Sequence, residues 1–142
     1  MWIAPKTDWN ADVDVNGNYI GDYFNASDYN RIKNNVEYIH GIAEKVYGTI
    51  PLTSMGEDKT LTDFIYADEM NLIEDNLNTI SQMTIGEPFN EHGYEENGRM
   101  MTFYELNYLE GFIYYLCDKI TNAFYGRHQM RFRMDYKKEV DF

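Results

Sequence analysis

The sequence is short of several features that would assign it to a common class. Its 142 residues include one cysteine, Cys117, so no disulfide can form within the chain. No apolar run approaches the roughly 18 residues that a membrane-spanning helix needs, and we therefore expect no contact with membranes. Basic residues are few: 12 Lys and Arg stand against 24 Asp and Glu, a net charge of −12. Direct binding to nucleic acid is therefore disfavoured, because phosphate contacts require clustered Lys and Arg.

Catalytic and cofactor motifs are also missing. The three histidines, His40, His92 and His128, are scattered and do not match any spacing of metal ligands. The sequence contains no nucleophile elbow, phosphate-binding loop or dinucleotide fingerprint. We therefore predict no catalytic residues, no cofactor and no enzymatic activity. Cys117 is interpreted as a packed thiol, because it lies one step past an apolar helical position.

Aromatic residues, in contrast, are abundant. They make up 16% of the chain, with 13 tyrosines, which excludes a disordered acidic tail. The length fits one domain, residues 1–142, that is large enough to bury a core.

One short pattern occurs three times: acidic, any, Asn, any, aliphatic, charged. It begins at Asp28, Glu69 and Glu105, and its asparagines, Asn30, Asn71 and Asn107, lie 41 and then 36 residues apart. A repeat of this period is typical of one supersecondary unit used several times around a common core.

Each occurrence continues as a helical pattern. Apolar residues follow at steps of three and four, which places an apolar stripe along one face of a helix. These stripes contain Tyr29, Ile32, Val36, Ile39, Ala43 and Val46; Met70, Ile73, Leu77 and Ile80; and Leu106, Leu109, Ile113, Leu116, Ile120 and Ala123. Helices of this length need tertiary burial, so we predict a mainly α fold: a three-helix bundle built from a threefold internal helix repeat.

The predicted helices span residues 24–48, 64–86 and 101–126. Asn25 with Asp28, and Thr102 with Glu105, resemble capping boxes at the first and third starts. The second start has Tyr66 in the cap position and is weaker. Glycines at 48, 86 and 126 are expected to end the helices, because glycine readily adopts the left-handed turn that closes a helix.

The repeated asparagine requires an explanation, because asparagine is a poor helix former. It lies one position past the apolar stripe, at the edge of the bundle. There its amide could bridge to the extended segment entering a helix or to a neighbouring unit. The alternative is an exposed polar residue shared among duplicated units, and we favour the bridging role.

Residues 1–23 are predicted to form an extended arm. Within it, Asp12, Asp14 and Asn16 followed by Gly17 copy the first half of a calcium loop. The twelfth position of that loop requires a bidentate acid and is Tyr23 here. We therefore favour a β-hairpin with a type I′ turn at Asn16-Gly17 over a calcium site.

The C-terminal residues 128–142 are predicted to form a short β-strand, because residues 129–136 alternate between apolar and polar. A single strand needs a partner, which the N-terminal arm or another subunit would supply. Residues 127–142 also carry a net charge of +2, so the preceding residues sum to −14. Such acidity serves solubility, or else forms a surface that docks on a basic partner or imitates DNA.

Two stretches carry a resemblance to a known family. Trp2 and the sequence Pro5-Lys6-Thr7-Asp8-Trp9, followed by residues 24–35 (FNASDYNRIKNN), resemble the opening of small virion proteins of phages and prophages of Firmicutes-type bacteria. The similarity extends through residues 55–60 and 66–71, and residues 12–21 resemble an insertion. It implies a structural protein of a tail, baseplate or fibre attachment, made in the bacterial host cytoplasm, located in the virion and oligomeric within the particle.

The leading functional hypothesis is therefore a virion structural protein that contacts other virion proteins. Its expected interaction residues are Trp2, Trp9, Arg131, Phe132 and Arg133, since buried aromatics dominate interface energy and free strands recruit partners. The first alternative is an acidic DNA mimic that inhibits a nucleic-acid-binding defence protein of the host. The second is a glycan-binding module at a fibre tip. A mimic requires paired rows of acids, whereas a scaffold requires only solvated faces.

Overall fold

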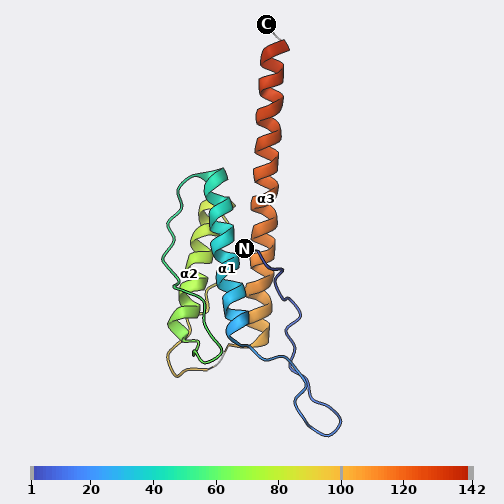
Figure 1. Ribbon diagram of the computed structural model, residues 1–142, viewed down its shortest axis with the longest axis vertical. Helices are drawn as coiled ribbons and strands as arrows, with labels where there is room; N and C mark the ends of the chain where they lie inside the picture. The colour runs from blue at the N-terminus through green and yellow to red at the C-terminus, as the bar shows by residue number, and fades with distance from the viewer. Residues whose placement is uncertain (1, 100, 141–142) are drawn as a thin grey trace.

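The protein is mainly helical. The computed structural model describes residues 2–99 and 101–140, with side chains described through residue 126. It contains three helices: α1 (Ala26–Tyr47), α2 (Ala67–Thr84) and α3 (Phe103–Val140). Each begins within three residues of its predicted start, so the expected helical fold is confirmed (Figure 1).

The three helices run in the same direction, so the chain must return along the bundle before each new helix (Figure 1). Three extended segments lie along the grooves between helices. Residues 2–9 contact α1 and α3, residues 50–59 contact α1 and α2, and residues 87–94 contact α2 and α3. Each pair of helices is therefore covered by one extended segment.

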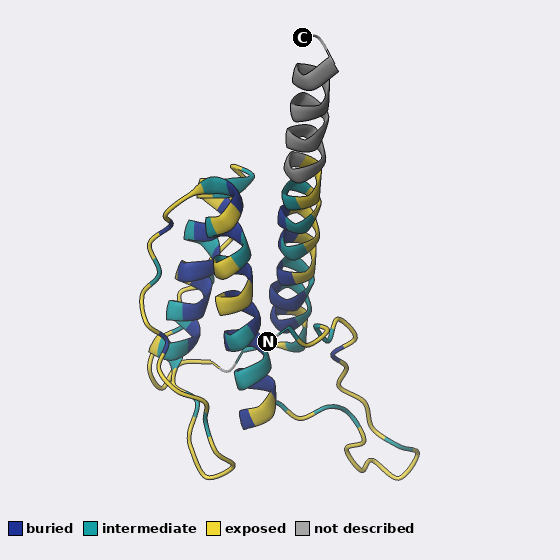
Figure 2. Cartoon of the chain, turned by 45° about the horizontal axis from the view of Figure 1, so that its top comes forward, coloured by how far each residue is buried: buried dark blue, intermediate teal, exposed yellow. Residues whose placement is uncertain are grey.

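The helical stripes meet in the centre of the bundle (Figure 2). Ile32, Ile73 and Leu109, which occupy the same position in the three patterns, are all 0% exposed. They belong to one core cluster that also includes residues of the extended segments, among them Trp9, Ile50 and Phe89. The extended segments are thus part of the core and not loose connections.

Each helix start has an acidic residue that reaches back to the backbone. In α1 the Asp28 carboxylate accepts a hydrogen bond from Asn25 N at 3.1 Å. In α2 the Glu69 carboxylate accepts one from Tyr66 N at 2.9 Å, and in α3 the Glu105 carboxylate accepts one from Thr102 N at 2.9 Å. This bond satisfies an amide that the helix leaves unpaired. The acidic residue of the threefold pattern is therefore a helix cap.

Two of the three predicted helix ends are confirmed. Gly48 caps α1 with a φ of 90°, and Gly86, with a φ of 73°, follows the end of α2. The prediction for Gly126 is wrong, because α3 continues through it to Val140. An internal glycine costs about 1 kcal/mol relative to alanine, which a long helix that is already formed can tolerate.

The predicted C-terminal strand is also wrong. The backbone of residues 128–140 belongs to α3, and the part of the chain that the structure describes contains no β-strand. The alternating residues Met130, Phe132, Met134 and Tyr136 also form pairs four positions apart, which suits a helix equally well. Extending an existing helix needs no new nucleus, whereas a strand would need a partner.

Candidate functional site

The three repeated asparagines each hold the backbone of an extended segment. Asn30 accepts from Lys59 N and donates to Lys59 O, at 2.7 and 2.9 Å. Asn71 makes the same two bonds with Tyr94, both at 2.7 Å. Asn107 makes them with Trp9, at 2.7 and 3.0 Å. The expected bridging role is confirmed, and the amide suits it because it offers a donor and an acceptor side by side.

The charged residue that ends each pattern contacts the same segment. The Glu110 carboxylate accepts a hydrogen bond from Lys6 N at 3.0 Å, and the Glu74 carboxylate accepts one from His92 N at 2.9 Å. Lys33 Nζ donates to Gly56 O at 3.1 Å. All three charged side chains are buried. The whole pattern therefore fixes extended segments onto helices.

A second pair of asparagines adds to this attachment. Asn35 makes the paired bonds with Ile3 N and O, and Asn76 makes them with Thr53 N and O. Both lie five residues after a repeated asparagine. The equivalent residue of α3 is Phe112, whose ring packs edge-on against Phe89 at 5.1 Å. Sequence reasoning missed these two asparagines, although their shared spacing was visible.

Trp9 belongs to the fold and not to an exposed docking site. It is 5% exposed, and its ring stacks on Phe103 with centroids 5.5 Å apart. Its indole Nε1 donates to Glu110, which also receives two bonds from the Arg31 guanidinium, at 2.9 and 2.8 Å. This burial corrects the interaction role expected for Trp9. Trp2 is partly buried against the Tyr38 ring.

The remaining predicted interaction residues lie on the last part of α3. Arg131, Phe132 and Arg133 fall outside the residues whose side chains the structure describes. Their interaction role stays a prediction.

The predicted hairpin is present in the arm. Val13 and Tyr19 form an antiparallel bridge, and Asp22 N donates to Asn10 O at 2.9 Å. Its turn differs from type I′. Such a turn needs a positive φ at both central residues, Asn16 and Gly17, and only Gly17 has one, at 82°. The bond from Asp14 N to Asn18 O instead encloses a three-residue loop.

The calcium candidates Asp12, Asp14 and Asn16 all lie in this hairpin. Asp14 Oδ1 already accepts from Asn16 N and Asn18 N, at 2.8 and 2.9 Å. Backbone hydrogen bonds, chiefly from Asn18, lower the pKa of the Asp14 carboxyl. Among the described residues, no group of three or more His, Cys, Asp or Glu is arranged to hold a metal ion.

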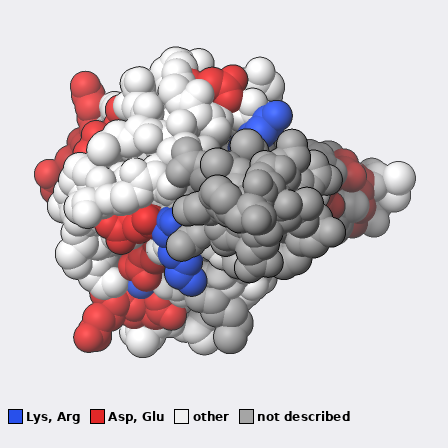
Figure 3. Space-filling model, turned by 90° about the horizontal axis from the view of Figure 1, so that it is seen from above, with Lys and Arg blue, Asp and Glu red and all other residues white. Residues whose placement is uncertain are grey.

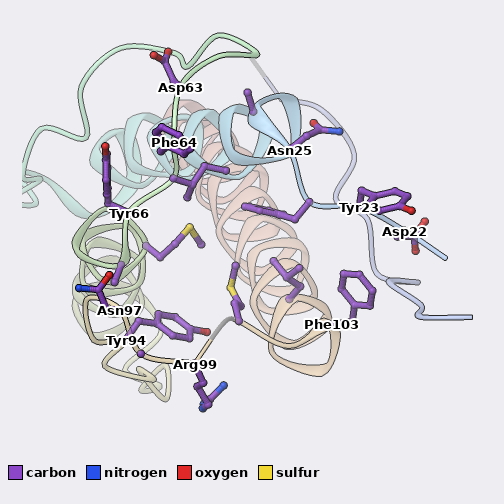
Figure 4. A pocket seen from close by; sticks show the side chains of 18 of the residues that line it. Asp22, Tyr23, Asn25, Asp63, Phe64, Tyr66, Tyr94, Asn97, Arg99 and Phe103 are labelled. Atoms are coloured by element: carbon purple, nitrogen blue, oxygen red, sulfur yellow. The ribbon is translucent and has the colours of Figure 1, made fainter. Parts of the chain in front are cut away.

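The candidate site is an open cavity at the end of the bundle where all three helices begin, and we call it the mouth (Figure 4). Its volume is about 1050 Å³. Side chains from the hairpin, from residues 61–67 before α2, from residues 94–101 before α3 and from the first turns of the helices surround it. Its apolar lining includes Tyr23, Phe24, Leu61, Phe64, Ile65, Tyr66, Met70, Tyr94, Met101, Phe103 and Leu106.

Several of these apolar side chains are open to solvent. Leu61 is 89% exposed, Phe64 74%, Tyr23 70% and Tyr66 55%. Large apolar residues gathered at one place on a surface are typical of a binding site for another molecule. Sequence reasoning missed this site, because Leu61 lies between two predicted helices and Phe64 and Ile65 fall inside the predicted helix 64–86.

Charged groups lie at the edge of the mouth. Asp22 lies at its edge on the hairpin and Asp63 on the segment before α2, and Arg99 lies on the side opposite Asp63, with both of these charged groups pointing outward (Figure 4). Arg99 pairs with Glu105 at 2.6 Å and lowers the pKa of that carboxyl to about 2, with help from the Thr102 amide and hydroxyl. Burial, followed by the nearby Glu74 charge, raises the pKa of Tyr94. The Arg99–Glu105 pair anchors the loop that forms this side of the mouth.

Searches against protein-family models, curated proteins and solved structures found no match. None of the described helices has the length and apolar character that crossing a membrane requires.

Proposed function

We propose that this protein is a structural component of a phage particle, in a tail, baseplate or fibre attachment, that acts by binding other proteins and not by catalysis. The observation that carries the proposal is the mouth, where Leu61, Phe64 and Tyr66 expose apolar surface at one end of a tightly fastened bundle. An apolar centre with a polar edge is the usual composition of a protein interface. The resemblance of residues 2–35 to small virion proteins supports the same function and implies location in the virion after synthesis in the host cytoplasm.

We also propose that the scaffold is a threefold internal repeat, each unit consisting of an extended segment and a helix. In each unit, the extended segment contains a residue that the asparagine of another helix holds, and the unit's own asparagine follows on the next helix. Lys59 precedes Asn71 by 12 positions, and Tyr94 precedes Asn107 by 13. Asn30 follows Trp9 by 21. The hairpin between residues 10 and 22 contains the extra residues, which supports the interpretation of that stretch as an insertion.

The arrangement of acids on α2 argues against the DNA-mimic alternative. Of its four acids, Glu74 is 0% exposed beside His92, and Glu69 pairs with Lys59 at 2.7 Å. Only Asp68 and Asp75 are exposed, seven residues apart. A mimic needs paired rows of free carboxylates at phosphate spacing, which these two residues do not form.

Glycan binding is the second candidate, because one feature of the mouth favours it. The Tyr23 ring lies beside Asp22 on one side of the mouth, and Tyr66 and Asn97 lie on the other side (Figure 4). Stacking on aromatic rings combined with a few hydrogen bonds is a common way to hold a polar ring-shaped ligand. A glycan array with the purified protein tests this candidate.

Particle incorporation tests the leading proposal. Phe64→Glu should exclude the protein from particles, because it places a charge in the apolar mouth, while Tyr114→Glu, at an exposed position elsewhere on α3, should be incorporated like wild type. The readout is quantitative mass spectrometry of purified particles, with circular dichroism to verify folding. Equal incorporation of both variants would refute a role for the mouth in assembly.

A further inference from the structure

We propose that the mouth binds the C-terminal end of α3 from a second copy of this chain, giving a head-to-tail contact. This inference rests on the proposed function and names the first partner of the same site. Three observations carry it: the placement of the two surfaces, their charge and their chemical character.

The two surfaces lie at opposite ends of the molecule. The mouth is formed where the parallel helices begin, and α3 projects from the end where they finish (Figure 1). Tyr47 ends α1 17 residues after Asn30, and the residue 17 positions after Asn107 is Phe124. Residues 125–140 therefore extend about 24 Å past the end of α1, at 1.5 Å per residue. A projecting helix at one end and a cavity at the other can meet only between different copies.

The charges of the two parts are opposite. Residues 127–142 carry five Arg and Lys against three acids, while the preceding 126 residues sum to −14. Asp22, Asp63 and Glu95 lie in the lining of the mouth. Figure 3, which views the end where α3 projects, shows acidic side chains at several places around the edge. Attraction between a basic helix and an acidic body increases the rate of encounter and orients the partners.

Apolar residues at the C-terminal end of α3 favour binding at the mouth over binding elsewhere on the acidic surface. The sequence of residues 127–140 includes Met130, Phe132, Met134, Tyr136 and Val140 among its basic residues. A helix that carries large apolar side chains can insert them into an apolar groove, and methionine adapts well to irregular cavities. Because the two surfaces differ, the contact is heterologous and can repeat into a ring or a filament, which suits a particle built from many copies.

Two full-length variants test this contact. We call residues 127–142, at the C-terminal end of the chain, the tail. Phe64→Glu damages the mouth and leaves this tail intact. The double substitution Arg131→Glu with Arg133→Glu reverses charge in the tail and leaves the mouth intact. Leu61→Glu is a second mouth variant in case Phe64→Glu fails to fold, and Tyr114→Glu is the matched control. Each is compared by sedimentation velocity over a range of concentrations, with circular dichroism as the folding check.

Wild type and the Tyr114→Glu control should self-associate increasingly with concentration, and less at high salt. Each mouth or tail variant alone should associate at least tenfold more weakly. An equimolar mixture of Phe64→Glu with the tail variant should form a one-to-one dimer and nothing larger. The intact tail of Phe64→Glu binds the intact mouth of the tail variant, and the two surfaces left over, a substituted mouth and a substituted tail, cannot bind a further copy.

Three results would overturn the inference: a wild type that stays monomeric, which would leave the mouth to another partner; folded variants that associate like wild type; or a mixture that forms no dimer. Its failure is separable from that of the proposed function. A monomeric protein found in purified particles contradicts only the self-contact, and a self-associating protein absent from particles contradicts only the virion role.

Discussion

Replacing Asn107 by alanine is the sharpest test of how the extended segments are held. Asn107 fixes Trp9 through two hydrogen bonds, one to its amide and one to its carbonyl. Trp9 is 5% exposed, so water cannot readily replace both bonds. The substitution therefore removes two bonds and also leaves buried backbone groups unpaired.

The expected loss follows from these two bonds. A hydrogen bond contributes about 1 kcal/mol net, and an unpaired buried group costs about 1–3 kcal/mol. Alanine returns about 0.5 kcal/mol, because it is the better helix former. With two groups left unpaired, Asn107→Ala should therefore lower the free energy of unfolding by about 1.5–5.5 kcal/mol, which for a chain of this size lowers Tm by about 5–15 °C.

Urea denaturation, followed by tryptophan fluorescence and by circular dichroism, measures this loss. Asn122→Ala is the matched control, because Asn122 is an exposed residue of the same helix. It should leave stability unchanged or raise it slightly. If Asn107→Ala costs less than about 0.5 kcal/mol, the asparagine is merely a shared surface residue and the bridging interpretation fails.

Three further predictions concern the core, the buried ion pair and acid stability. Ile73→Asp should unfold the domain, because it places an unpaired charge at a position that is 0% exposed; an unchanged Tm would contradict the bundle. Arg31→Met should cost about 3–5 kcal/mol in urea denaturation by leaving Glu110 charged and buried, and adding Glu110→Gln should recover part of that loss; no recovery would refute the pairing. The pKa of Glu105 is lowered from its ordinary value of 4.5, so the ionised carboxylate stabilises the fold fully when the pH is above 4.5. This contribution disappears as the pH falls from 4.5 to about 2. Thermal melts in that range should lose less stability for Arg99→Met than for wild type, and parallel curves would refute the pairing.

The sequence predicted the helices well because several independent signals coincided. The apolar stripe, the acidic cap and the following glycine agreed for α1, and its observed bounds, Ala26–Tyr47, lie within two residues of the expected ones. The repeated asparagine was also informative, since a poor helix former kept in one register requires a tertiary reason. The partners of these asparagines could not be predicted, because their bonds join segments up to 98 residues apart.

The errors arose where a local pattern had two readings. The alternation in residues 129–136 fits a strand, and it also fits a helix, because the apolar residues form pairs at i and i+4. The helix forms because α3 already precedes these residues, and extending it needs no new nucleus. Trp9 was interpreted as an interface residue because tryptophan is common at interfaces. Its indole instead has internal partners: it donates to the buried Glu110, and the partly buried Arg31 lies over its ring. The mouth was invisible in the sequence, because it forms only when the three helix starts come together.

Immunogold electron microscopy tests the virion role most directly. An antibody against this chain would be applied to phage particles purified from cells that produce the protein. We predict gold particles at one fixed place on the tail, baseplate or fibre attachment, in several copies per particle. Particles that stay unlabelled, while the protein is detected in the lysate of the same cells, would contradict it.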